Sequence, residues 1–252
     1  MQKWQTPSEN SRLRKGDGEL LDKKGQSLYM EIVGSLMYLS GGTRPDMAWA
    51  VGNLCRHMSA PTTVHLVAAK HALRYLAGTR TLGLCYTGQP DQQPVIEAYA
   101  DADFGGDLDT RRSTTGYLFI INGGAVSWQS KLQKTVSTST QEAEYQASGA
   151  AAKEALWLRK LLPDLGLPVD VITIAGDNQA CLDLLNNPMV GGERRKHIDI
   201  THHFVRERIH ETKELEFKWV PTGEMVADCL TKPVTLEVLI RCRDQMGLRD
   251  AF

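Results

Sequence analysis

Four acidic residues stand in short segments that could bring them together to hold metal ions. Asp101 closes an apolar-rich run, and Asp177 follows a run that is typical of a strand. Glu144 lies early in a long alanine-rich stretch, and Asp228 stands at the start of another helical pattern. Gathered carboxylates repel one another, so such a cluster requires divalent cations. Two metal ions held by carboxylates form the arrangement that cleaves phosphodiesters.

Each carboxylate also has an ordinary structural explanation. Asp101 could lie in a strand-end turn, and Asp228 could be a solvated helix residue. Asp177 could simply cap the helix that follows it, because aspartate is a favoured N-cap. Glu142 competes with Glu144, although its place near a helix N-terminus suits a capping role.

Composition is that of a globular chain. The 252 residues are 42% hydrophobic and 23% charged, with a net charge of -1. No apolar run approaches the ~20 residues that span a bilayer, and no secretory signal opens the chain. The five cysteines are scattered and form no Cys-x-x-Cys pair. We therefore predict an intracellular, reducing location, in a cytoplasmic particle or the nucleus, without secretion or membrane insertion.

The chain divides into three parts by pattern. Residues 1–25 are polar and aperiodic, which predicts a mobile leader. Residues 26–92 contain three helical apolar stripes, which predict a helical unit too small to be a robust domain alone. Residues 93–252 begin with three strand patterns, the second and third joined by the hairpin signal at 122–124.

The remaining pattern alternates helices and strands. A helix at 140–165 precedes a strand at 170–176, and a later strand is expected at 214–220. The other helices are expected at 178–186, 197–212, 224–231 and 234–246. Merging adjacent helices, the order βββαβαβα predicts an α/β fold: a mixed five-stranded sheet with helices on both faces.

The ordered motifs resemble a known family. Residues 95–232 resemble a ribonuclease H domain, in particular that of copia-type retrotransposon Pol polyproteins. The matching blocks, in order, are 99–107, 111–117, 126–131, 139–145, 177–180, 196–200 and 220–233. The segment 32–79 looks like the thumb and connection that precede this domain in such polyproteins. No Tyr-x-Asp-Asp motif of a polymerase palm occurs, so we expect the C-terminal part of a polyprotein, or a separated remnant, without polymerase activity.

The resemblance implies a ribonuclease H-like fold and a two-metal hydrolase. Asp101, Glu144, Asp177 and Asp228 would be the catalytic residues and the ligands of two Mg²⁺ ions, for which Mn²⁺ could substitute. The substrate would be the RNA strand of an RNA:DNA hybrid, and the missing palm and fingers would be partners. The loop 221–225 carries no histidine, which puts in doubt a histidine role in product release.

Further residues are expected to contact the hybrid. Polar groups that could read 2′-hydroxyls are Asn178 and Gln179. A basic set expected to touch phosphates consists of Arg194, Arg195, Lys196, His197, Arg206 and Arg208. An ordinary solvated helix face is the alternative for this set. Zinc binding by the four histidines between 197 and 210 is disfavoured, because two are adjacent and no cysteine pair accompanies them.

Two other functions compete with the hybrid-specific nuclease. The first is a catalytically silent nucleic-acid-binding remnant of a broken polyprotein, which the missing palm supports. The second is a structure-selective nuclease of the same fold, such as a junction resolvase, which the copia-type blocks disfavour. Metal binding separates the hybrid-specific nuclease from the silent remnant, because an intact site would bind Mg²⁺ and be stabilised by it.

Overall fold

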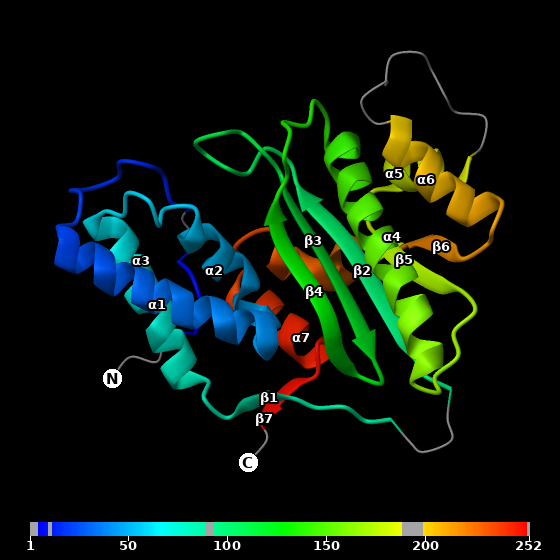
Figure 1. Ribbon diagram of the computed structural model, residues 1–252, viewed down its shortest axis with the longest axis horizontal. Coiled ribbons are helices and arrows are strands. Elements are labelled where there is room, and N and C mark those ends of the chain that lie inside the picture. The colour runs from blue at the N-terminus through cyan, green and yellow to red at the C-terminus, as the bar shows by residue number, and fades with distance from the viewer. Residues whose placement is uncertain (1–4, 10–11, 89–92, 188–198, 251–252) are drawn as a thin grey trace.

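The computed structural model describes residues 5–9, 12–88, 93–187 and 199–250 (Figure 1). Its N-terminal part is helical, as the sequence predicts. The elements are α1 (Lys23–Gly42), η1 (Pro45–Met47), α2 (Ala48–Cys55) and α3 (Thr63–Gly78). Asp22 begins α1 by accepting a hydrogen bond from the Gly25 amide at 2.8 Å, which satisfies one of the free donors of the first turn.

Five strands form the central sheet. They are β2 (Ile96–Asp103), β3 (Thr114–Ile121), β4 (Gly124–Leu132), β5 (Ile172–Gly176) and β6 (Leu215–Trp219). Their spatial order is β4-β3-β2-β5-β6, with β2, β3 and β4 antiparallel and with β5 parallel to both β2 and β6. Asn122 and Gly123 both have positive φ, so the predicted hairpin turn joins β3 to β4. This topology is the predicted ribonuclease H-like fold.

Helices follow the strands in the expected order. They are α4 (Thr140–Asp164), α5 (Gln179–Asn186), α6 (Asp199–His210), η2 (Thr222–Glu224), η3 (Val226–Leu230) and α7 (Leu236–Gln245). The prediction of one α-helix over 224–231 was wrong, because the segment between Pro221 and Pro233 forms two short 3₁₀ turns instead. The sequence also missed a two-stranded sheet, in which β1 (Leu82–Leu84) pairs with β7 (Leu248–Asp250).

Helices lie on both faces of the sheet (Figure 1), and a hydrophobic core lies on each face. The first joins β2, β3, β5 and β6 to α4, α5 and α6, with Phe119 and Ile174 fully buried in it. The second joins Leu118 and Ile120 of β3 to α1, α2, α3, η3 and α7. The helical unit, together with η3 and α7, therefore packs against one face of the sheet at β2, β3 and β4. The three-part division of the chain remains a prediction about its domains.

Residues 12–22, which fall in the predicted mobile leader, contact the helical unit. The Thr62 hydroxyl donates to the Asp17 carbonyl, and His65 Nε2 lies 2.9 Å from the Arg14 carbonyl oxygen. Leu20 forms an isolated β-bridge with Thr62. These contacts give backbone groups of residues 12–22 hydrogen-bond partners within the protein, where a polar and aperiodic segment alone would bond to water.

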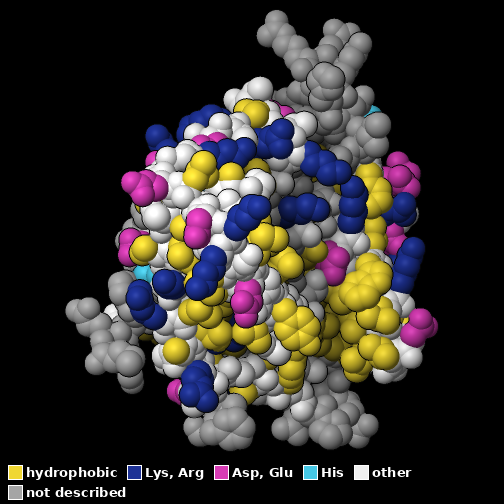
Figure 2. Space-filling view, turned by 60° about the vertical axis from the view of Figure 1, so that its left-hand side comes forward, with side chains coloured by type: hydrophobic (Ala, Val, Ile, Leu, Met, Phe, Trp, Pro, Cys, Tyr) yellow, Lys and Arg dark blue, Asp and Glu magenta, His cyan; other side chains and the backbone are white. Residues whose placement is uncertain are grey.

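The surface that includes the helical unit is mixed in character. Figure 2 shows Lys and Arg side chains over the upper part of this face and hydrophobic side chains gathered over its lower part. Met30, Met37 and Tyr38 of α1 are exposed, Tyr38 by 83%. Of the helices that the structure describes, none has the combined length and apolar character needed to cross a bilayer.

Candidate metal centre

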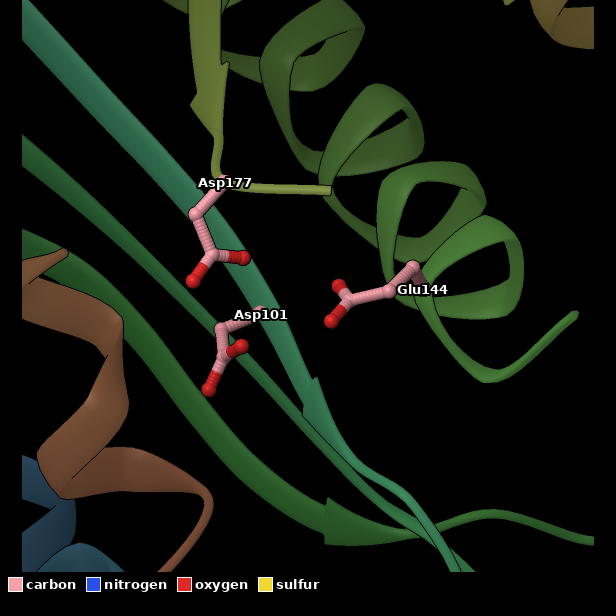
Figure 3. A group of neighbouring side chains, drawn as sticks. All are labelled: Asp101, Glu144 and Asp177. Atoms are coloured by element: carbon pink, nitrogen blue, oxygen red, sulfur yellow. The ribbon is translucent and has the colours of Figure 1, made fainter. Parts of the chain in front are cut away.

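Three of the four predicted carboxylates converge at one place (Figure 3). Asp101 lies near the end of β2, Glu144 lies in the first turns of α4, and Asp177 follows β5. One carboxylate oxygen from each lies within 4.8 Å of the others. Asp101 is buried, whereas Glu144 and Asp177 are partly exposed. Over the described parts of the chain, this is the one group of three or more such side chains that could hold a metal ion.

The sheet and α4 explain why these side chains meet. The strands β2 and β5 are parallel neighbours, with Tyr99 opposite Ala175, so Asp101 and Asp177 leave the sheet at the same end. The helix α4 crosses the face of β2 and β3, and this brings its first turns to that end. Residues up to 76 positions apart in the chain, two that follow or end strands and one on a helix, are thereby brought together.

The structure separates Glu142 from Glu144. Glu142 Oε2 accepts hydrogen bonds from the amide and the hydroxyl of Thr138, both at 2.7 Å. Ser139 caps the same helix by accepting from the Glu142 amide at 3.1 Å. Glu142 therefore takes part in the hydrogen bonds at the start of α4, and Glu144 is the residue that points toward Asp101.

Capping of α5 falls to Asn178 rather than to Asp177. The Asn178 side chain accepts from the Cys181 amide at 2.9 Å. Asp177 instead accepts a hydrogen bond from the Thr222 hydroxyl at 2.8 Å. Asn178, and not Asp177, therefore caps α5. The Asp177 carboxylate remains available to the cluster.

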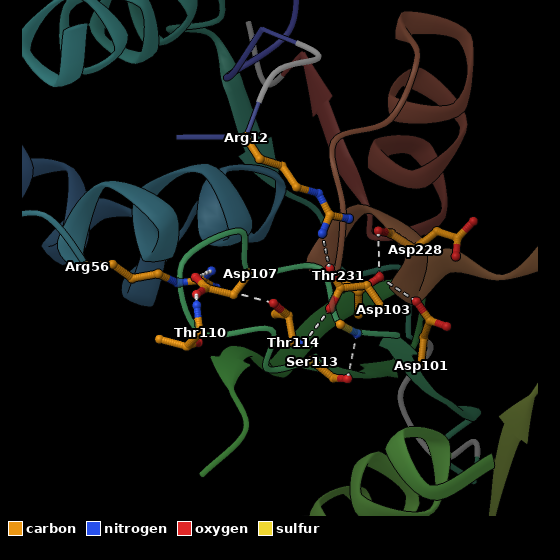
Figure 4. Close-up of polar contacts among 11 residues, drawn as sticks. Arg12, Arg56, Asp101, Asp103, Asp107, Thr110, Ser113, Thr114, Asp228 and Thr231 are labelled. Carbon is orange, nitrogen blue, oxygen red and sulfur yellow. Dashed lines mark hydrogen bonds and ion pairs between the residues drawn. The ribbon is translucent and has the colours of Figure 1, made fainter. Parts of the chain in front are cut away.

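Asp228 lies beside the cluster, on η3, and has a basic partner. Its Oδ1 lies 2.6 Å from Nζ of Lys232, one turn further along the chain. Thr231, between them, donates its hydroxyl hydrogen bond to Asp101 (Figure 4). Gly116, opposite Asp101 on β3, allows this approach, because a Cβ there would lie 2.7 Å from Thr231 Cγ2. The structure therefore brings Asp228 near Asp101 but outside the group of three.

Burial raises the pKa of the two most enclosed carboxyls. It raises the pKa of Asp101 to about 7; Lys232 and the Thr231 hydroxyl oppose this, and the neighbouring Asp228 and Asp177 add to it. Burial, together with Asp101 and Asp177, raises the pKa of Glu144 to about 9. A divalent cation bound among such crowded carboxylates would reduce their mutual repulsion. An all-oxygen ligand set suits Mg²⁺ or Mn²⁺.

Other acidic residues near the site are neutralised by arginines (Figure 4). Asp103 lies 2.9 Å from Nη1 of Arg12, and Asp107 lies 2.9 Å from Nη1 of Arg56. Among the ion pairs of the described residues, none involves Asp101, Glu144 or Asp177. Ion pairs thus neutralise the charges of Asp103, Asp107 and Asp228. The carboxylates of Asp101, Glu144 and Asp177 have no such ion pair among the described residues.

The structure describes only some of the predicted nucleic-acid-binding residues. Gln179 is exposed and donates to Asp183 at 2.7 Å, and Arg206 donates to the Asn187 carbonyl at 2.9 Å. Arg194, Arg195, Lys196 and His197 lie outside the described residues. Of the histidines considered for zinc, His210 Nε2 lies 3.1 Å from the Leu185 carbonyl oxygen.

Sequence reasoning missed the residues that surround the carboxylates. Lys232 and Thr231 stand in the matching block at 220–233 but were not assigned a place in the site. Exposed lysines at 131 and 134 and the exposed Arg111 were also missed. Lys131 is opposite Thr115, which is opposite Ala102, so Lys131 lies level with the end of β2 across the sheet. A signal existed for two of them, because Arg111 and Lys131 stand inside the matching blocks 111–117 and 126–131.

Comparison with known proteins gives sequence relatives. No family model matches the chain. It is 44% identical over 220 residues to the retrovirus-related Pol polyprotein from transposon TNT 1-94 of Nicotiana tabacum, covering 87% of this chain and 16% of that one. The Pol polyprotein from transposon RE1 of Arabidopsis thaliana is 40% identical over 87% of this chain and 15% of its own length.

Two other similarities are weaker guides to function. Over 130 residues the chain is 50% identical to secreted RxLR effector protein 161 of Plasmopara viticola, covering 52% of this chain and 90% of that protein. A solved structure of LC11 ribonuclease H1 with an RNA/DNA hybrid matches 54% of this chain and 94% of its own, with 16% identity and a TM-score of 0.41. That score is too low to carry an argument, so the fold assignment rests on the strand order and element order.

Proposed function

Because this chain belongs to the Pol polyproteins of copia-type retrotransposons, we propose that it hydrolyses the RNA strand of RNA:DNA hybrids with divalent metal ions. The observation that carries the proposal is the convergence of Asp101, Glu144 and Asp177, three carboxylates without ion-pair partners in the described structure. A ribonuclease H-like sheet that presents three carboxylates at one end supports phosphodiester hydrolysis over a purely structural role.

The chain spans about one sixth of the length of the transposon polyproteins that it matches. The activities of those whole proteins are therefore proposals for this chain. We propose that the palm and fingers of a parent polyprotein are its partners and that it has no polymerase activity itself. The predicted reducing intracellular setting is likewise proposed, and all five cysteines are free thiols.

The carboxylates would hold two Mg²⁺ ions, for which Mn²⁺ could substitute. Bound metal would supply an activated water and would stabilise the leaving oxygen of the scissile phosphodiester. Asp101 is central to the site, because its carboxylate interacts electrostatically with Glu144, Asp177 and Asp228. Asp228 would serve as the fourth ligand once Lys232 releases it. Thr231 orients the Asp101 carboxylate through its hydroxyl hydrogen bond.

Hybrid binding would use cations and polar groups around the carboxylates. Lys131, Lys134 and Arg111 are exposed and belong to segments that adjoin the end of β2. We propose that they contact phosphates, together with Arg194, Arg195, Lys196, His197 and Arg206 of the predicted basic set; Arg208, the remaining member, pairs with Glu214. Asn178 and Gln179, at the start of α5 beside Asp177, are proposed to read 2′-hydroxyls of the RNA strand.

The decisive experiment compares the purified chain with an Asp177→Asn variant on a labelled RNA:DNA hybrid in Mg²⁺. Asp164→Asn, an exposed change at the far end of α4, is the matched control. We expect the parent and the control to cut the RNA strand and Asp177→Asn to leave it intact. If the folded parent binds the hybrid and does not cut it, the silent nucleic-acid-binding remnant replaces the nuclease.

A further inference from the structure

The buried side-chain amide of Gln133 lies where the segments that build the metal centre meet. Gln133 directly follows β4 and is 6% exposed. Its Nε2 donates to Thr115 Oγ1 of β3 at 3.1 Å and to the Ala143 carbonyl of α4 at 2.9 Å. Its Oε1 accepts from the Ser137 hydroxyl at 2.9 Å. The donors and the acceptor of this amide are thus all used, which fixes its orientation.

The two residues that accept hydrogen bonds from the Gln133 amide, Thr115 and Ala143, both lie close to proposed metal ligands. Ala143 immediately precedes Glu144 in the chain. Thr115 immediately precedes Gly116, which is the register partner of Asp101 across β2 and β3. A single side chain therefore ties the turn that carries Glu144 to the strand that backs Asp101.

The helix α4 has other supports of its own. Ser139 and Glu142 satisfy its first turn, and its apolar face is buried against the sheet over several turns. These supports stabilise the helix, and Gln141, which donates to the Ala180 carbonyl at 2.7 Å, ties its first turn to α5. The amide of Gln133 ties the same turn to β3, because its two donors reach a strand hydroxyl and a helix carbonyl at once.

We propose that Gln133 is a positioning residue for metal binding: it sets the separation between the Glu144 and Asp101 carboxylates. The proposal rests on the proposed metal-dependent function. Mg²⁺ demands near-ideal octahedral ligand geometry, and a site is held to productive geometry by hydrogen bonds behind its ligands. Changing such supporting residues typically lowers metal affinity by about 10- to 100-fold.

The test substitutes Gln133→Met, which keeps the length of the side chain and removes its donors. Gln129→Met is the matched control, because Gln129 lies on the same strand hairpin and bonds Tyr117 rather than α4. Mn²⁺ affinity is measured from the loss of the free Mn²⁺ signal in electron paramagnetic resonance, beside circular dichroism and the Mg²⁺ dependence of hybrid cleavage. We expect Gln133→Met to weaken the tightest Mn²⁺ site about 10-fold or more. Gln129→Met should leave that affinity unchanged.

The readouts separate positioning from simple stabilisation. A Gln133→Met variant that melts earlier but binds Mn²⁺ as tightly as the parent overturns the proposal. If that variant does not fold, Ser137→Ala replaces it, because it frees the carbonyl end of the Gln133 amide; unchanged Mn²⁺ affinity there also overturns the proposal. A parent that binds Mn²⁺ without cutting the hybrid refutes the proposed hydrolysis alone, and a parent that binds no Mn²⁺ refutes both.

Discussion

The Glu144→Gln substitution is expected to stabilise the metal-free protein at neutral pH. Glutamine has the shape of a protonated glutamate and never ionises. In the folded chain the pKa of Glu144 is raised from 4.5 to about 9, so folding favours the protonated form. The parent protein therefore loses stability as pH rises from 4.5 toward 9, because the unfolded state releases a proton that the folded state retains. The variant lacks this loss.

The pKa shift sets the size of the effect. One pKa unit corresponds to about 1.4 kcal/mol, so the parent would lose at most roughly 3 kcal/mol between pH 5 and pH 7 from this group. Glu144 is partly exposed, and solvent screens part of its charge. We therefore expect Glu144→Gln to exceed the parent in free energy of unfolding by about 1–3 kcal/mol at pH 7. The gap should nearly close at pH 5.

Urea unfolding at pH 5 and pH 7, followed by circular dichroism in the presence of a chelator, measures this gap. Glu142→Gln is the control, since Glu142 accepts two hydrogen bonds from Thr138 and its loss should not stabilise the protein. Adding Mg²⁺ at pH 7 should stabilise the parent more than Glu144→Gln, because the variant lacks a ligand. A gap of the same size at both pH values, or a less stable variant at pH 7, would refute the electrostatic account of the cluster.

Three further predictions follow from particular contacts. Gly116→Ala should push η3 away from Asp101, lowering stability by about 1–3 kcal/mol in urea unfolding and slowing hybrid cleavage. Arg12→Gln should cost about 1–3 kcal/mol, since it leaves buried Asp103 without its cation, and adding Asp103→Asn should recover part of that loss. Asp228→Asn should leave one Mn²⁺ bound and remove the second in an electron paramagnetic resonance titration; retention of both would exclude Asp228 as a ligand.

Much of the fold follows from local sequence patterns. The hairpin at Asn122 and Gly123, the alanine-rich α4 and the strand β5 each carry a periodic or turn signal strong enough to predict the element. The two 3₁₀ turns around Asp228 were not predicted, because a short segment between two prolines has too few residues to show a period. The β1–β7 pair was missed for the same reason: three-residue strands have no pattern, and their partners are far apart in sequence.

The carboxylates of the site were predicted from type and family resemblance, whereas their surroundings were not. The residues alone offered both Glu142 and Glu144; the resemblance selected Glu144, and the structure turns Glu142 toward Thr138 and Glu144 toward the other carboxylates. Gln133 acts through contacts that cross between elements, so no spacing in the chain predicts its role. Lys232 pairs locally with Asp228, but its electrostatic effect on Asp101 crosses to β2. Such supporting roles depend on contacts between residues far apart in the sequence. A single sequence does not reveal those contacts.

The second core has a consequence for the order in which the chain can fold during synthesis. Tyr29, Leu36 and Tyr75 of the helical unit are buried together with Cys242 and Met246 near the opposite end of the sequence. Arg243 also donates to the Tyr75 hydroxyl at 3.3 Å. On the ribosome, the helical unit emerges about 160 residues before these partners, a delay of roughly 10–30 s at ordinary synthesis rates. The part of its apolar face that packs against α7 would spend that interval uncovered, so the helical unit, although made before the sheet, would be completed late and would depend on chaperones or neighbouring polypeptide until then.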